Sequence, residues 1–360
     1  MRNLLLTFVL ALGATQIQAQ DDPFYEGAVD LDALYQQIDD AILKAPEYVA
    51  ARERQINDCR DSLLAANNDD QRLKYTQQLF VLYKPFRNDS ALHYAEQCIS
   101  IAEALHRPDL VGRFRSWLAY QCSNTDRHSE ALEELRKVDR KALDNAGLVD
   151  YYSAWMHVSG ELANYSQRKQ VRQHYFDLQN LYRDSVMMVA DEGSEAWLHL
   201  KMDILSAQRQ FQEALVVSDK WIRTVKDGTH EGAYAAFYRS MCYDLLENHD
   251  LARYWLGKSA LDDIRCAVRD QASLLFLAER LANDGDIEHA RRYMEFAKSC
   301  NTAFLPRIRA YQVNPLLSIT EKCNQAASTG ANLTLIITVA GIILLLMALT
   351  LIILIIRRKL

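Results

Sequence analysis

A short phrase containing a small alanine recurs along the chain, and it constrains the fold more than any other feature. The phrase occurs as Asp89-Ser90-Ala91-Leu92, Ser129-Glu130-Ala131-Leu132, Gln212-Glu213-Ala214-Leu215, Asp250-Leu251-Ala252-Arg253 and Glu288-His289-Ala290-Arg291. The intervals between the alanines are 40, 83, 38 and 38 residues, and 83 holds two units of about 41 if a degenerate repeat lies near Gln170 to Tyr182. These intervals predict six repeated units.

The segments between these phrases have a helical character. No proline lies between Pro108 and Pro306, and the chain has only 12 glycines, which suits long helices better than a sheet protein with many turns. Apolar residues also recur at helical spacing. The first such stripe is formed by Leu31, Leu34, Ile38 and Ile42. Pro46 and Pro108 fall where we expect breaks between helices.

These patterns predict an all-α fold, an α-solenoid of divergent helix hairpins. The period and the early alanine in each second helix resemble the tetratricopeptide repeat, although the units here are longer than the standard 34 residues. A single hairpin cannot bury its apolar face, so the hairpins stack and leave a broad concave face. The resemblance implies a protein or peptide partner on that concave face, of unknown identity.

The first 19 residues have the order of a secretory signal peptide. A positive charge at Arg2 precedes an apolar run from Leu4 to Leu12, and a polar stretch leads to a cleavage site expected after Ala19. The exported domain is therefore predicted to span residues 20–330.

A second apolar run lies near the C-terminus. Residues 333–356 contain no charge, and 24 residues at the rise of an α-helix extend about 36 Å, enough to cross a bilayer. Arg357-Arg358-Lys359 follow directly, and such a cluster marks the cytoplasmic side. We predict a transmembrane helix within 331–356, which contacts the membrane through 333–356, and a cytoplasmic tail at 357–360. The expected location is a bacterial inner membrane with a periplasmic N-terminal domain.

Charge and cysteine content exclude several classes of function. Four of the 41 basic residues lie in the two ends, which leaves 37 Lys and Arg against 47 Asp and Glu, a net charge of −10. Such a domain is a poor ligand for nucleic acid, and we expect this chain to contact none. The seven cysteines include no CxxC pair, so zinc is not expected. They are interpreted as buried free thiols, with one or two disulfides as the alternative.

No motif for catalysis is present. The nine histidines are scattered, Thr229-His230-Glu231-Gly232 lacks the second histidine of a zinc protease, and neither a GxSxG nor a phosphate-binding glycine motif occurs. We therefore predict no enzyme and assign no catalytic, cofactor-binding or metal-binding residue. Asp39-Asp40 and Asp262-Asp263 are interpreted as solvated helix faces.

Two aromatic groups allow two interpretations. They are Tyr151, Tyr152 and Trp155, and then Tyr234, Phe237, Tyr238 and Tyr243. At helical spacing such residues fill the core between hairpins, and the alternative is that they line a ligand groove.

The chain as a whole resembles a family of bacterial membrane-anchored tetratricopeptide-like proteins that carry only a domain-of-unknown-function name. The resemblance spans about residues 28–325. It begins at Leu31-Asp32, passes through Tyr48, Arg52-Glu53, Ile56 and Asp61-Ser62-Leu63 as the opening helix pair, and continues at Asp89-Ser90-Ala91-Leu92 with Tyr94-Ala95. Its closest stretch includes Asp263-Ile264, Ala267-Val268, Ser273-Leu274, Leu277-Ala278, Gly285-Asp286-Ile287, Ala290, Tyr293, Arg307, Arg309 and Leu316 to Ile319.

This resemblance implies a sensor-like layout, with an exported repeat domain, one membrane pass and, in longer members, a cytoplasmic regulatory region. The given sequence ends four residues after the apolar run. We expect either that it is truncated before the cytoplasmic region or that this member works only from outside the cytoplasm. The predicted function is a non-catalytic, membrane-tethered periplasmic module that binds or senses a protein or peptide, as the ectodomain of a regulator. The alternatives are an envelope scaffold or a glycan-binding uptake component.

Overall fold

The structure, a computed structural model, describes residues 22–24, 29–304 and 310–359. These residues form α-helices and one short 3₁₀-helix, and no strand occurs among them. The first helices are α1 (Leu31–Leu64), α2 (Asp69–Tyr83), α3 (Asn88–Ala104), α4 (Pro108–Ser123), α5 (His128–Arg136), η1 (Arg140–Ala142), α6 (Asn145–Tyr165) and α7 (Lys169–Val189). They are followed by α8 (Glu195–Ala207), α9 (Phe211–Thr224), α10 (His230–Leu245), α11 (His249–Arg265), α12 (Ala272–Asp284), α13 (Ile287–Phe304) and α14 (Ala310–Lys359).

The helices from α2 to α13 pair into six successive hairpins, as the repeat predicts. The recurring alanines lie in the second helices α3, α5, α9, α11 and α13, and the degenerate unit is the hairpin α6/α7. All five alanines are completely buried, because a side chain of that size allows paired helices to approach closely. The predicted all-α solenoid of tetratricopeptide-like hairpins is confirmed.

Five of the turns between helices share one backbone shape although none of them uses glycine at the critical position. A residue with a φ between 53° and 60° follows α3, α4, α8, α10 and α11. In each turn the next backbone N–H donates to the carbonyl five residues earlier, as Asn248 does to Tyr243 at 2.9 Å. This bond closes the last helical turn and reverses the chain direction. The residues in this conformation are His106, Asp126, Arg209, Glu247 and Ala267.

The first helix differs from the sequence prediction. The residues from Leu31 to Leu64 form one continuous helix, and Pro46 lies inside it, so the predicted break and the predicted opening helix pair are wrong. Packing on both sides of the proline explains the continuity. Residues before it, such as Ile38, pack against α11, whereas the part of the helix after it packs against α2, and Ile56 belongs to the hydrophobic cluster that α2 and α3 form. Pro108, in contrast, starts α4 as expected.

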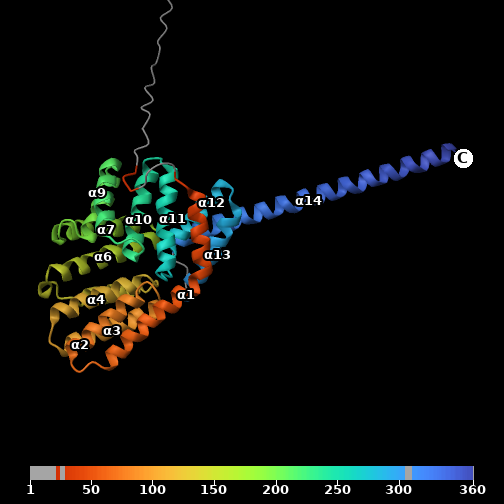
Figure 1. Cartoon of the computed structure of the whole chain (residues 1–360). Coiled ribbons are helices and arrows are strands. Elements are labelled where there is room, and N and C mark those ends of the chain that lie inside the picture. The colour runs from red at the N-terminus through yellow and green to blue at the C-terminus, as the bar shows by residue number, and fades with distance from the viewer. Residues whose placement is uncertain (1–21, 25–28, 305–309, 360) are drawn as a thin grey trace, which may run out of the picture.

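Because α1 packs against both halves, it connects the two ends of the solenoid (Figure 1). Arg52 of α1 donates to the Cys266 carbonyl after α11 at 2.8 Å. The Arg269 backbone N–H donates to the Pro85 carbonyl at 2.9 Å, and its guanidinium lies 4.1 Å from the centroid of the Phe86 ring. The turn after α2 therefore contacts the turn after α11 directly, and α1 spans both.

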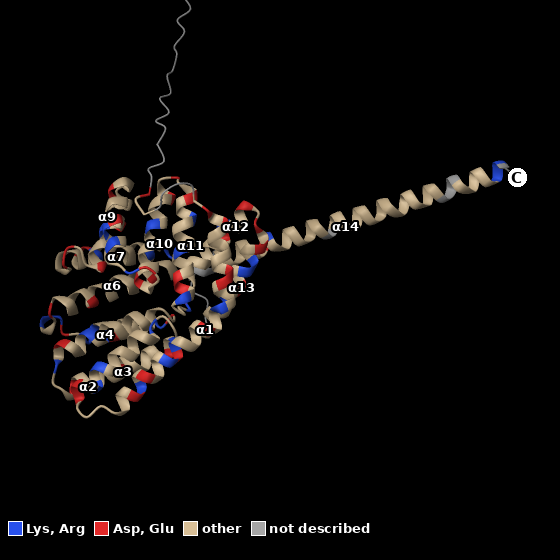
Figure 2. Cartoon of the chain, viewed as in Figure 1, with Lys and Arg blue, Asp and Glu red and all other residues tan. Residues whose placement is uncertain are grey.

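The last helix, α14, begins in the core and extends far from it. Ile319 is completely buried against α12 and α13, whereas Leu333 and the residues that follow are largely exposed. The segment Pro315–Arg358 is long and apolar enough to cross a membrane, by length and composition. Figure 2 shows that its distal part carries almost no charge until the basic end. The membrane boundaries at 331–356 remain a prediction, and the predicted signal peptide at 1–19 lies outside the described residues.

All seven cysteines are free thiols. Cys98, Cys122 and Cys242 are buried, and the other four are half-buried. Burial raises the pKa of the Cys98 thiol to about 12 and that of Cys266 to about 11. Thiols with such a pKa are protonated at neutral pH and are poor nucleophiles.

Candidate ligand-binding site on the inner face

One face of α10 carries three residues at intervals of four, His230, Tyr234 and Tyr238. The hydroxyl of Tyr234 donates to that of Tyr238 at 3.4 Å, and the two ring centroids are 5.0 Å apart. His199 of α8 packs against Tyr238 with a centroid distance of 4.2 Å. Burial raises the pKa of both tyrosines, so their hydroxyls are protonated and can donate or accept hydrogen bonds at neutral pH.

A second aromatic pair lies on α4 and α6. The rings of Tyr120 and His157 stack with a centroid distance of 3.9 Å. The ammonium of Lys84 lies 5.4 Å from the centroid of Tyr120, within the range of a cation–π interaction. The amide of Gln121 donates to the Lys84 carbonyl at 3.2 Å, which holds the turn that carries the lysine.

The two aromatic groups influence each other electrostatically. Tyr120 of α4 contributes to the raised pKa values of both Tyr234 and Tyr238. The pKa of Lys84 is influenced by the carboxylates of Asp150 on α6 and Glu195 on α8. Since such coupling falls off with distance, the turn after α2 and the helices α4, α6, α8 and α10 converge around Lys84.

Two of these residues are exposed to water although protein surrounds them. The side chain of His230 is 43% exposed, yet burial is the largest single influence on its pKa. Lys84 is also exposed to solvent, and burial by the surrounding protein lowers its pKa. We refer to this group of residues as the inner face, and it comprises Lys84, Tyr120, His157, Glu195, His199, His230, Tyr234 and Tyr238.

At one edge of the inner face, His230 forms an ion pair with Asp263 of α11. The Nδ1 atom lies 2.8 Å from a carboxylate oxygen of Asp263. Burial lowers the pKa of His230, but the carboxylate outweighs it, so the pKa of His230 is raised overall. Burial also raises the pKa of Asp263, although His230 opposes this. The pair therefore retains protons more strongly than separate groups in water would.

The structure corrects one interpretation from the sequence. Asp262 and Asp263 are not on a solvated face, because both are buried. A carboxylate oxygen of Asp262 lies 3.2 Å from the ammonium of Lys258, one turn earlier on the same helix. The other carboxylate pair divides, with Asp40 exposed and Asp39 paired with Arg292.

The aromatic residues divide between the two interpretations as well. Tyr243 is buried in the core, whereas Tyr234 and Tyr238 line the inner face. Tyr151 and Trp155 are half-buried, and the Trp155 ring stacks on Tyr182 with a centroid distance of 5.1 Å. Sequence reasoning missed His230, although its spacing of four from Tyr234 places both on one helical face.

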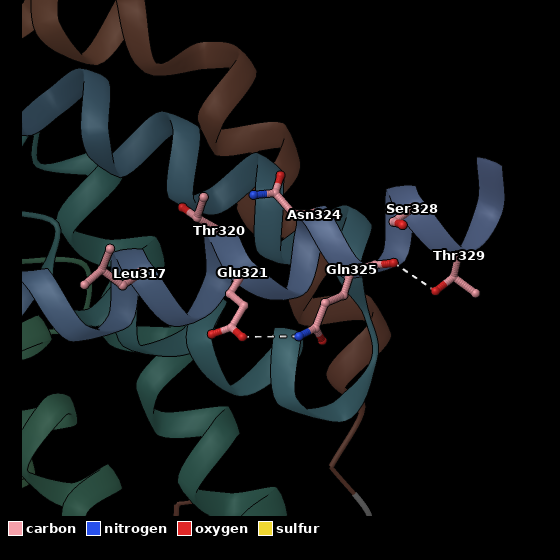
Figure 3. Close-up of a pocket in the computed structure, with 7 residues that line it drawn as sticks. All are labelled: Leu317, Thr320, Glu321, Asn324, Gln325, Ser328 and Thr329. Atoms are coloured by element: carbon pink, nitrogen blue, oxygen red, sulfur yellow. Dashed lines mark hydrogen bonds between the residues drawn. The ribbon is translucent and has the colours of Figure 1, made fainter. Parts of the chain in front are cut away.

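A separate shallow depression runs along α14 (Figure 3). Its lining residues all belong to that helix, so it is the side of one helix rather than an enclosed cavity. The polar groups there bond to each other, since Gln325 donates to Glu321 at 3.3 Å and Thr329 donates to the Gln325 carbonyl at 2.9 Å. This surface offers no convergent set of groups comparable with the inner face. The lining residues are Leu317, Thr320, Glu321, Asn324, Gln325, Ser328 and Thr329.

Six successive helical hairpins define a helical-repeat domain of the tetratricopeptide type, a class that typically acts through binding. The family model described as the SusR N-terminal TPR domain matches residues 42–315, and the chain belongs to this family.

No curated protein matches the chain. Among solved structures, a Rap protein complexed with Competence and Sporulation Factor is similar with a TM-score of 0.40 and 10% sequence identity, over 76% of this chain and 77% of that one.

Proposed function

We propose that the chain is a membrane-tethered module outside the cytoplasm, the binding part of a regulator, which recognises a peptide or a protein segment on its inner face. The observation that carries this proposal is the convergence of groups from the turn after α2 and from α4, α6, α8 and α10 around Lys84. Family membership supports it, because tetratricopeptide-type repeats are binding scaffolds rather than catalysts.

The chemistry of the inner face suits an amphipathic chain. Tyr120, Tyr234 and Tyr238 offer flat apolar rings together with hydroxyls that can bond to backbone amides. Lys84 can bind a carboxylate, and Glu195 can bind a cationic side chain. We therefore expect a peptide that inserts apolar side chains between the rings and places an acidic group near Lys84.

Site-specific photo-crosslinking tests this proposal. A benzophenone amino acid at position 238 in the full chain, expressed in membranes, should yield a reproducible adduct with one peptide or protein, identified by mass spectrometry. The same amino acid at Leu64, which is 85% exposed at the end of α1, is the control and should not yield this adduct.

A charge reversal makes the test specific. Lys84→Glu should reduce the adduct at position 238 by about tenfold, because it places a like charge against an acidic ligand. Lys74→Glu, at an exposed position of α2, changes the net charge equally and should leave the adduct unchanged. Equal adducts in both variants would contradict an acidic group of the ligand near Lys84. Saturable binding of an oligosaccharide with no peptide adduct would contradict peptide recognition and favour the glycan-binding alternative.

A further inference from the structure

A completely buried arginine lies among α9, α10 and α11, apart from the inner face. The exposed fraction of Arg239 is 0%. Its guanidinium donates to the carboxylate of Asp219 at 2.6 Å and to the hydroxyl of Ser218 at 3.1 Å, both on α9. It also lies 4.9 Å from the centroid of Trp255 on α11. A charge held this deeply is costly unless all of its partners are present.

The remaining partner comes from the N-terminal segment of the chain. The Asp22 side chain is completely buried, and its Oδ2 atom accepts from Arg239 Nε at 3.1 Å, Tyr243 OH at 2.8 Å and Trp255 Nε1 at 2.6 Å. The other carboxylate oxygen accepts from the Phe24 backbone N–H at 2.8 Å. One carboxylate thus satisfies three buried donors that α10 and α11 direct to one point.

The aromatic residue two positions later completes the contact. The Phe24 ring meets the Trp255 ring edge-on, with centroids 6.1 Å apart. The guanidinium groups of Arg239 and Arg223 lie 5.0 and 5.2 Å from the Phe24 centroid. The segment is therefore held by a buried carboxylate and by an aromatic ring near two cations.

The N-terminal segment and the residues that hold it are far apart in the sequence. Asp22 and Arg239 are 217 positions apart, and residues 22–24 belong to no helix. The side-chain donors to the Asp22 Oδ2 atom lie on α10 and α11, and Ser218 and Asp219 of α9 hold the arginine in place. Because the donors converge on one point and the arginine is held in place, these residues form a preorganised site for an anionic peptide.

We infer that the residues of α9, α10 and α11 around Arg239, here called the Arg239 site, form a peptide-binding site whose ligand is an acidic segment in a turn, with an aromatic residue two positions after the acid. Its occupant is the chain's own segment Asp22–Phe24, and the site binds the same segment as a separate peptide. This inference is independent of the ligand of the inner face.

Binding of an added peptide tests the inference. The full chain with Asp22→Ala and Phe24→Ala, purified in detergent, is titrated into a fluorescent peptide of residues 20–28, and the anisotropy is measured. We expect saturable binding. A peptide with Asp22→Asn should bind at least about tenfold more weakly, because it replaces charged hydrogen bonds with neutral ones. A scrambled peptide of the same composition is the control.

Two substitutions that remove a single donor probe the receptor. Trp255→Phe and Tyr243→Phe, each added to the double variant, should weaken the peptide by about five- to tenfold without loss of helical circular dichroism. Tyr48→Phe on α1 is the matched control and should not alter binding. Absence of saturable binding, or equal affinity for the Asp22→Asn peptide, would overturn the inference.

If the double variant does not fold, a measurement on the protein with its own segment in place tests the Arg239 site. Hydrogen exchange of the Phe24 amide, which donates to Asp22, is compared between the unmodified full chain and its Trp255→Phe variant. At least about tenfold faster exchange in the variant supports the site, because the carboxylate loses a donor that fixes it. Equal exchange rates in the two proteins would contradict it.

Discussion

Buried titratable residues are the feature of this protein that most depends on solution conditions. Burial lowers the pKa of His230, but the contact with Asp263 outweighs it and the pKa is raised overall. Burial raises the pKa of Asp263, although the contact with His230 opposes this. Glu231 also raises the pKa of His230, whereas Lys84 lowers it. Because the folded pair binds protons more strongly than the unfolded chain, its contribution to stability decreases as the pH rises.

The pH dependence of unfolding tests this pair. The stabilisation by His230 is fully present below its ordinary pKa of 6.5 and is lost as the pH rises through the raised value. The raised pKa of Asp263 acts in the same direction above its ordinary value of 3.8. In detergent, His230→Gln should therefore lower the Tm at pH 6 but not at pH 9. We expect a difference of roughly 1–3 °C, since the histidine is partly exposed.

The control for this measurement is an exposed histidine. His249→Gln lies at the first residue of α11 and should leave the pH profile of the Tm unchanged. A Tm difference between His230→Gln and the unmodified chain that stays constant from pH 6 to pH 9 would show that the histidine acts through packing alone.

At the level of single residues, the sequence predicted the small residues better than the polar ones. The five repeat alanines are buried as their phrase indicates, because only a small side chain fits there. Asp263 was assigned to solvent because its partner, His230, is 33 positions away and no local pattern relates them. The Arg239 site was missed for the same reason.

Among the elements, α1 has the most demanding packing. An added Cβ at Gly257 of α11 would lie 2.7 Å from Leu34 Cδ2 of α1, closer than real contacts allow. Leu34 is itself buried, so it has little room to move. The glycine therefore permits the close approach of α1 and α11 that connects the two ends of the solenoid.

Alanine substitutions at two helical glycines test this approach. Gly257→Ala should reduce the free energy of unfolding by about 1 kcal/mol, since overpacking costs roughly 1–3 kcal/mol and the gain in helix propensity is near 1 kcal/mol. Gly330→Ala in α14, where nothing lies within 4 Å of the added atom, is the control and should be neutral or slightly stabilising. Chemical denaturation in detergent measures both, and equal effects would argue against a tight contact at Gly257.

The type and order of the elements were readable from the sequence, whereas their ends were not. Helical spacing and the alanine period predicted six hairpins, because both reflect packing that every unit repeats. Pro46 predicted a break that does not occur, since burial of α1 on both sides of the proline outweighs its local preference. The turns gave no glycine signal, because residues such as Glu247 adopt the left-handed conformation there.

At the scale of the whole molecule, the core and the apolar run share one helix. Ile319 is buried in the cluster that contains Leu34, and α14 continues without interruption to Lys359. Pro315 lies inside the helix near its start, and no other proline follows. The repeat domain and the proposed membrane segment are therefore joined by a helix rather than by a flexible linker.

Hydrogen exchange in lipid nanodiscs tests the membrane segment. Amides of residues 333–356 should remain unexchanged for hours, because their hydrogen bonds lie in hydrocarbon. Amides of residues 321–330, which form exposed turns of the same helix, should exchange at least about tenfold faster. Similar rates in both stretches would contradict a membrane-spanning position.

The uninterrupted α14 also limits the distance between the repeat domain and the membrane. From buried Ile319 to Leu333, at the start of the apolar run, the helix rises about 21 Å at 1.5 Å per residue. If the apolar run lies in a bilayer, Ile319 lies at most about this distance from the lipid surface, and the repeat domain cannot move farther out while the helix stays intact. A partner that is itself fixed to the membrane must then carry the recognised segment at a similar distance from the lipid surface. Partners whose segment lies farther out would not reach the repeat domain.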